Sequence, residues 1–187
     1  AMYAAKSQGR NHCQLYVTHM SEQIQHRLTL KKDLRRAISN EEFFLVFQPQ
    51  IEIVSGYFFA IEALLRWQHP TRGLLLPASF ISIAEDNSLI SDISHWVLEK
   101  RLKTVAHLRG KHHDLYVSVN ISAHDLLQPT QLTQKITTCL QKYGLPGNAL
   151  ELEPTESFFL EQPEVASTTL QDWNNQGIRI AIDDFGT

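Results

Sequence analysis

Two adjacent aspartates, Asp183 and Asp184, directly follow the apolar run I-R-I-A-I at 178–182. This run is typical of a buried strand. Placing paired carboxylates at the end of such a strand is unfavourable unless a cation neutralises them. The pair therefore indicates a metal site.

Three further polar residues lie within or at the end of apolar, strand-like runs, namely Glu62, Asn120 and Glu153. Functional groups of α/β barrels and doubly wound sheets converge at the carboxyl ends of the strands, so we expect these side chains to join the two aspartates. Carboxylates and one amide form an all-oxygen ligand set, which suits Mg²⁺ or Mn²⁺ better than zinc. The nine histidines have no paired metal spacing, and most are interpreted as solvated surface residues.

Each of these residues also has an ordinary structural explanation when taken singly. Glu62 could be an exposed edge-strand glutamate, and Asn120 could begin a turn or cap a helix. Glu153 could be a surface acid held in extended backbone by the proline that follows it. Glu156 could cap the next helix. The occurrence of such residues at successive strand ends favours a metal centre.

The elements that must position these residues alternate between strand and helix after Glu41. The turn at 54–56 predicts that the first two strands pair antiparallel. The later βα alternation predicts a mostly parallel sheet or barrel. The expected strands are Phe43–Gln48, Tyr57–Leu65, Leu115–Ile121, Leu150–Glu153 and Ile178–Asp183, and the expected helices are Pro77–Glu85, Ser91–Leu108, Thr130–Tyr143 and Pro163–Gln176.

The segment before these elements contains a short unit and a helix. Residues 1–17 are typical of a helix end stopped by Gly9 and a short strand ending at Val17. Ser21–Ser39 has the pattern of an amphipathic helix that rests on the next domain, with Ser21 as its N-cap. The expected apolar stripe of this helix consists of Ile24, Leu28, Leu34 and Ile38.

The composition of the 187-residue chain is globular, with 43% hydrophobic and 20% charged residues. A net charge of −3 disfavours binding of a nucleic-acid polymer but not of a small anionic ligand. Cys13 and Cys139 have no metal-ligand spacing and suggest reduced thiols. No signal peptide or membrane-spanning segment is predicted. We expect a cytoplasmic protein, with membrane attachment only through upstream segments of a longer parent.

Six short motifs together resemble EAL-domain proteins, phosphodiesterases that hydrolyse cyclic di-GMP. The resemblance covers 41–187 and implies an incomplete TIM-like (β/α) barrel with about five strands, the first antiparallel. The motifs are F-Q-P at 47–49, E-A-L at 62–64, G-L-L-L-P-A-S-F-I at 73–81, S-V-N-I-S at 118–122, E-P-T-E-S at 153–157 and I-D-D-F-G-T at 182–187.

The opening segment A-M-Y-A-A-K-S-Q-G-R-N is similar to the end of a GGDEF (diguanylate cyclase) domain. This similarity implies three parts: a GGDEF remnant at 1–17, a linker helix at 18–40 and the N-terminal portion of an EAL domain at 41–187. The active-site loop of a GGDEF domain is absent from the chain, so no cyclase activity is expected of it.

The EAL resemblance also implies a role for each site residue. Two metals would bind a phosphodiester oxygen and lower the pKa of a bridging water, and in-line attack would open the ring to linear pGpG. The family is expected to act as a homodimer when full length. The implied ligands of one metal are Glu62, Asn120, Glu153 and Asp183; Asp184 would bind a second metal, Gln48 and Arg66 would contact the dinucleotide, and Glu156 would steady the loop after the D-D-F-G strand.

The sequence departs from the family pattern in two respects. Pro154 and Gln50 replace residues that are usually apolar, and a proline removes a backbone donor beside Glu153. The family's later lysine and glutamates lie beyond Thr187. A barrel with five strands cannot close, so we expect the isolated chain to be unstable, aggregation-prone or dependent on a second copy.

Two functions fit these observations. The chain is either a fragment of a cyclic di-GMP phosphodiesterase, inactive by itself, or a degenerate EAL domain that binds cyclic di-GMP or a protein without hydrolysis. The intact E-A-L and D-D-F-G motifs favour the first function. The proline and the absent family residues favour the second.

Overall fold

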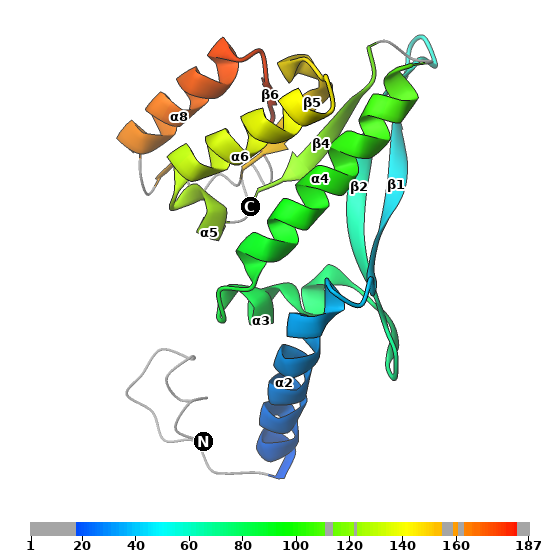
Figure 1. Cartoon of the computed structure of the whole chain (residues 1–187), viewed down its shortest axis with the longest axis vertical. Coiled ribbons are helices and arrows are strands. Elements are labelled where there is room, and N and C mark those ends of the chain that lie inside the picture. The colour runs from blue at the N-terminus through cyan, green and yellow to red at the C-terminus, as the bar shows by residue number, and fades with distance from the viewer. Residues whose placement is uncertain (1–17, 111–113, 122, 155–158, 161–162, 183–187) are drawn as a thin grey trace.

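The computed structural model describes residues 18–110, 114–121, 123–154, 159–160 and 163–182. These residues form an α/β fold around one mixed sheet with the order β1-β2-β4-β5-β6, with β3 paired to the far part of β2 (Figure 1). Over the described residues the sheet is open, with β1 and β6 at its ends, and the predicted fold class is confirmed. The strands are β1 (Phe43–Ile51), β2 (Phe58–His69), β3 (Gly73–Leu75), β4 (Tyr116–Asn120), β5 (Leu150–Glu153) and β6 (Arg179–Ile180).

The first two strands form a long antiparallel hairpin, as predicted, with Gln48 directly opposite Glu62. Gly56 adopts a φ of 68°, a left-handed conformation that glycine tolerates without strain, and its N–H donates to the Glu52 carbonyl at 2.8 Å. The turn thus sets the register that brings these two polar side chains together. The short strand β3, which was not predicted, extends the same antiparallel sheet beyond the hairpin.

The remaining strands, β2, β4, β5 and β6, are parallel to one another, as the βα alternation predicted. The last of them is shorter than expected, because only Arg179 and Ile180 are assigned as strand. The ladder continues one residue further, since the Ala181 N–H donates to the Leu152 carbonyl at 3.0 Å. Asp183, the predicted end of this strand, lies outside the described residues.

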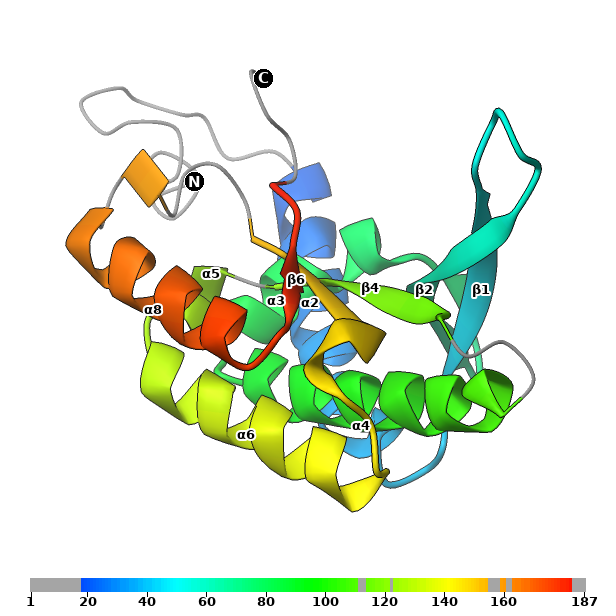
Figure 2. The same cartoon turned by 90° about the horizontal axis from the view of Figure 1, so that it is seen from above.

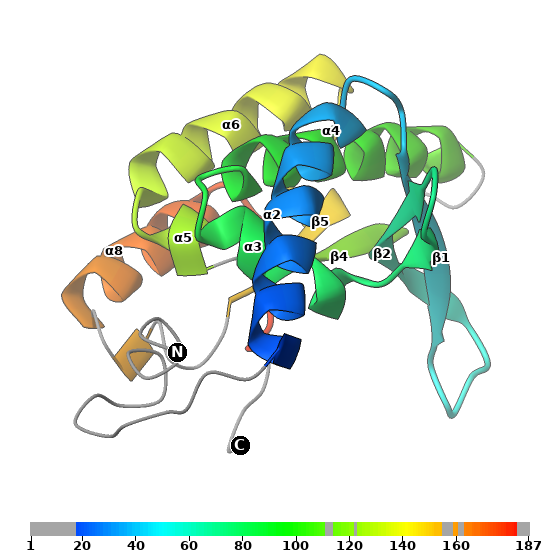
Figure 3. The ribbon, with the colours of Figure 1, turned by 90° about the horizontal axis from the view of Figure 1, so that it is seen from below.

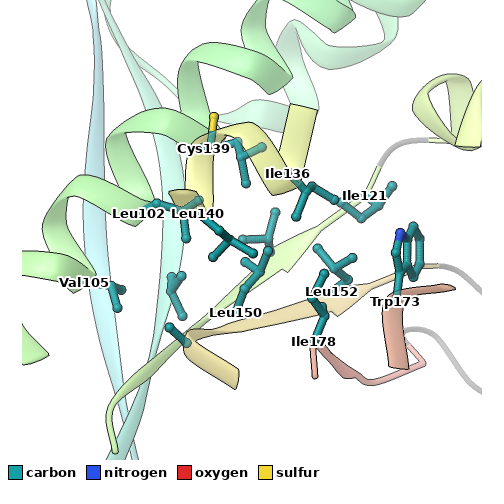
Figure 4. Close-up of a cluster of buried hydrophobic side chains, with 14 of the residues drawn as sticks. Leu102, Val105, Ile121, Ile136, Cys139, Leu140, Leu150, Leu152, Trp173 and Ile178 are labelled. Carbon is teal, nitrogen blue, oxygen red and sulfur yellow. The ribbon is translucent and has the colours of Figure 1, made fainter. Parts of the chain in front are cut away.

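Three long helices cover one face of the parallel strands (Figure 2). Their apolar stripes meet alternate strand residues, which form one core with Trp173 (Figure 4). The Trp173 Nε1–H also donates to Thr133 Oγ1 at 2.9 Å. The opposite face of the same strands is left for polar side chains. The helices are α4 (Ile90–Arg109), α6 (Pro129–Lys142) and α8 (Pro163–Asn175), with the short α5 (Ala123–Leu126) between the first two.

A second core lies where α2 (Thr18–Ala37) packs beside α3 (Ile81–Glu85), which follows the 3-10 turn η1 (Pro77–Ser79) (Figure 3). The predicted packing of this helix on the domain is confirmed, because Leu34 is buried. The predicted stripe is wrong at Leu28, which is 54% exposed, because the buried face instead follows Leu30, Leu34 and Ala37. The chain is already helical at Thr18, so Ser21 lies inside the helix and is not its N-cap. The unit predicted at 1–17 lies outside the described residues.

Gly147 lies just before β5, where the chain contacts the main chain of Gln176 and Gly177, just before β6. A Cβ added at this position would lie 1.9 Å from the Gln176 carbonyl oxygen, which is main chain and cannot rotate away. We therefore expect Gly147→Ala to destabilise the protein by about 3 kcal/mol or more, at the upper end of the range for overpacking. Urea unfolding checks this value.

Gly110→Ala is the matched control for that substitution. Gly110 has a helical φ of −58°, and its added Cβ would make an ordinary 3.5 Å contact. A loss of stability for Gly147→Ala no larger than for Gly110→Ala would show that Gly147 is not in close contact with the main chain at Gln176.

Candidate functional site

The sheet face opposite the helices carries a row of polar side chains. Glu62 pairs in register with Ser118, and Ser118 pairs with Glu151 on the next strand. Residues that pair in register lie on the same face, whereas the flanking Val117 and Val119 face the core. Ser118 donates from Oγ to Glu151 Oε1 at 2.8 Å, so this carboxylate already has a partner. The sequence analysis did not single out Ser118 or Glu151.

The carboxyl-terminal ends of β4 and β5 bring Asn120 and Glu153 next to each other in register. The Ile121 N–H donates to the Glu153 carbonyl at 3.1 Å, so the ladder is intact through this residue. Asn120 is exposed and Glu153 is half-buried. Their side chains lie on the same face as Glu62, two residues beyond its row. The structure therefore places these three predicted ligands on one face of the sheet.

Pro154 follows the last residue of β5 and is buried. It has no N–H to donate, and the described hydrogen bonds between β5 and β6 end where the Ala181 N–H donates to the Leu152 carbonyl.

The two predicted substrate contacts lie at different distances from Glu62 along the hairpin. Gln48 is exposed and directly opposite Glu62. Arg66 is half-buried and lies on the same face four residues further along β2, with its Nη1 donating to the Leu65 carbonyl at 2.8 Å. A ligand that touches both residues must extend along the strand.

The remaining predicted site residues, Asp183, Asp184 and Glu156, lie outside the described residues. Their parts in the site stay predictions.

The described part of the site supplies oxygen donors, namely two carboxylates and one amide from three neighbouring strands. Among the described residues, no three His, Cys, Asp or Glu side chains come together as a metal site. The described donors nevertheless fit a hard divalent cation, because Asn120 and Glu153 are adjacent at a strand end and none of the donors is a soft ligand. Asp183 and Asp184 are the predicted source of the additional carboxylates.

Arg101 is a charged residue beneath this site that the sequence analysis missed. It lies on the sheet-facing side of α4 and is 5% exposed, and its Nη2 donates to the Ala63 carbonyl. Burial lowers the pKa of its guanidinium to about 10, against the opposing effect of the negative charges of Glu153 and Glu62. The signal was available in the sequence, since Val97, Leu98, Leu102 and Val105 define a helical apolar stripe in which Arg101 occupies a core position.

A separate shallow hollow of about 590 Å³ lies between α6 and α8. None of the predicted site residues lines it. The hollow is an open cleft between two helices and contains none of the predicted ligands. The polar sheet face is therefore the better candidate for chemistry. Representative lining residues are Thr133, Glu164, Thr168 and Asp172.

The α/β sheet, with helices on one face and polar groups at the carboxyl strand ends on the other, is close to the fold of TIM-like barrel proteins, although the described sheet does not close. The chain matches the family model described as EAL domain over residues 31–187. It superposes on a solved structure of the PaMucR phosphodiesterase in a c-di-GMP complex with a TM-score of 0.81 and 34% identity, covering 85% of this chain and 64% of that one. The chain belongs to the EAL-domain family.

Two curated relatives match the whole of this chain. It is 36% identical over 188 residues to the bifunctional diguanylate cyclase/cyclic di-GMP phosphodiesterase MucR of Pseudomonas aeruginosa, and it spans 27% of that protein. It is 36% identical over 187 residues to the cyclic di-GMP phosphodiesterase PdeR of Escherichia coli and spans 28% of that protein. In the described part of this chain, no helix has both the length and the apolar character needed to cross a membrane.

Proposed function

We propose that this chain carries the metal- and substrate-binding strands of a phosphodiesterase that hydrolyses cyclic di-GMP to linear pGpG. The observation that carries the proposal is the convergence of Glu62, Asn120 and Glu153 on one sheet face in a member of the EAL family. The relatives MucR and PdeR, named as cyclic di-GMP phosphodiesterases, support the same reaction and substrate.

In this proposal each polar residue has a defined task. The carboxylates and the Asn120 amide hold Mg²⁺ or Mn²⁺, with Asp184 assigned to a second ion. When bound, such ions lower the pKa of a water and offset charge on the phosphodiester. Gln48 and Arg66 orient the dinucleotide along β2, and Glu156 steadies the loop after the last strand. The ligand set is Glu62, Asn120, Glu153, Asp183 and Asp184.

We further propose how the chain is organised and where it works. Residues 1–17 are the end of a GGDEF domain, 18–40 form a linker helix, and 41–187 begin the EAL domain. The protein functions in the cytoplasm or on the cytoplasmic face of the inner membrane, as a homodimer when full length. Any attachment to the membrane is through upstream segments.

A non-catalytic module that binds cyclic di-GMP or a protein partner is the second candidate. Pro154 favours it, because this buried proline directly follows the proposed ligand Glu153 and restricts the backbone there. A small shift of that carboxylate would preserve ligand binding and lose turnover.

The test is incubation with cyclic di-GMP and Mg²⁺ or Mn²⁺, with chromatographic detection of pGpG. Two polypeptides are compared: this chain and a longer one that carries a complete EAL domain. We expect product from the longer one and little from this chain, because the sheet of the described residues is open at both ends. Calorimetric binding by the longer polypeptide without product would instead establish the binding module.

A further inference from the structure

Arg101 occupies a core position of α4 although it is charged. Its neighbours on the helix stripe, Leu98, Leu102 and Val105, all belong to the core beneath the sheet. Only 5% of the arginine is exposed. A buried cation is unfavourable unless it is paired or hydrogen-bonded, so its contacts identify what it does.

The guanidinium is attached to the sheet at one point beside the candidate site. Nη2 donates to the carbonyl of Ala63, the residue that follows Glu62. The β2–β4 ladder ends at the pair of Glu62 with Ser118, so this carbonyl lies one residue beyond the last paired position. Arg101 therefore supplies a donor to the β2 backbone just beyond the paired part of the strand.

The other two nitrogens of the side chain are not satisfied in the same way. Nε and Nη1 are buried and have no hydrogen-bond partner among the described residues. An arginine that only joined a helix to a strand would be expected to use more of its five N–H donors in hydrogen bonds. The unfavourable burial is offset in part by the negative charges of Glu153 and Glu62, which favour its protonated form. With a pKa of about 10, the side chain is a cation at neutral pH.

We propose that Arg101 is a positioning residue that acts as a built-in cation for the carboxylate site. It holds the β2 backbone at Ala63, next to Glu62, and balances the charges of Glu62 and Glu153 before metal binds. The inference rests on the proposed function, since it assigns these carboxylates to the metal. A fixed positive charge near a metal site also opposes the metal. Arg101 therefore weakens metal binding while it stabilises the metal-free site.

A double-mutant cycle in the metal-free protein tests the charge coupling directly. Thermal melts are recorded for the wild type, Arg101→Met, Glu62→Gln and the double variant. We expect Glu62→Gln to lower Tm by about 2–4 °C more in the wild type than in the Arg101→Met background, which corresponds to a coupled pair in a chain of this size. Additive shifts would overturn the inference, whatever the metal does.

Arg109→Met is the matched control for this cycle. Arg109 lies on the last turn of the same helix and also donates to a strand-side carbonyl, from Nη1 to Leu115 at 2.7 Å. Its partner Leu115 precedes β4 and pairs with neither Glu62 nor Glu153 in the sheet. Its cycle with Glu62→Gln is expected to be additive.

Titration with Mn²⁺ alone, followed by the electron paramagnetic resonance signal of the free ion, tests the second half of the inference. Arg101→Met should bind Mn²⁺ about threefold to tenfold more tightly than the wild type, because a fixed like charge has been removed. Arg101→Lys keeps the charge and should stay within about twofold of the wild type. A merely structural role predicts weaker binding for Arg101→Met, and this result would overturn the inference. Failure of the wild-type protein to bind Mn²⁺ would instead overturn the proposed metal site.

Discussion

Replacement of Glu153 by glutamine is expected to reduce hydrolysis of cyclic di-GMP by about 100-fold or more. Glu153 ends β5 beside Asn120, on the sheet face that carries the proposed metal ligands. Glutamine keeps the size of the side chain but removes the negative charge that a hard cation requires. Changes to residues that only support a ligand already cost about 10–100-fold in activity or metal affinity, so loss of a ligand should exceed that.

The chain offers a close control for this substitution on the same strand. Glu151 lies two residues earlier on the same face and accepts a hydrogen bond from Ser118 at 2.8 Å. Glu151→Gln should retain activity within about tenfold, because the amide oxygen can still accept from the Ser118 hydroxyl. Initial rates of pGpG formation are measured for both variants in a polypeptide with a complete EAL domain, together with Mn²⁺ affinity. Equal losses in the two variants would contradict a special role for Glu153.

The order of the elements could be predicted because their signals are local. Alternating apolar strands and helical stripes predicted the antiparallel hairpin and the parallel strands that follow it. The short β3 was missed because its three residues, Gly73–Leu75, are too few for a periodic pattern. Leu28 was placed on the wrong face of α2 because a loose stripe leaves the buried direction to tertiary packing, which selects Leu30 instead.

The site could be predicted in residue type but not in register. The sequence indicated that Glu62, Asn120 and Glu153 end or interrupt strands, and the structure brings them to one face. Nothing local indicates that Gln48 lies opposite Glu62, because register depends on the hairpin turn and the pairing of the whole strand. The buried cation Arg101 was overlooked for a related reason, because its burial depends on which face of α4 packs against the sheet.

Trp67→Ala is expected to cost about 3–5 kcal/mol of stability, the range for removal of a buried aromatic side chain. Trp67 is fully buried, and its ring packs against Phe43 and Phe80 with centroid distances of 5.6 and 5.4 Å. Its Nε1 donates to Glu42 Oε2 at 2.9 Å. Alanine would leave a cavity in the core that α2 shares with β2, and this carboxylate would lose its indole partner.

The position of Trp67 makes the result informative about the site as well as the core. It lies on β2 with Glu62, but its side chain faces the core, whereas that of Glu62 faces the polar side of the sheet. Urea unfolding should therefore show a large loss for Trp67→Ala, and Mn²⁺ affinity measured at a temperature where the variant is folded should stay within about threefold of the wild type. Tyr57→Ala, which removes an aromatic ring that is 53% exposed in the hairpin, should change stability by less than about 1 kcal/mol. Equal losses of stability in the two variants would show that the second core is not formed as described. Loss of metal binding in folded Trp67→Ala would show that the two faces of β2 are coupled.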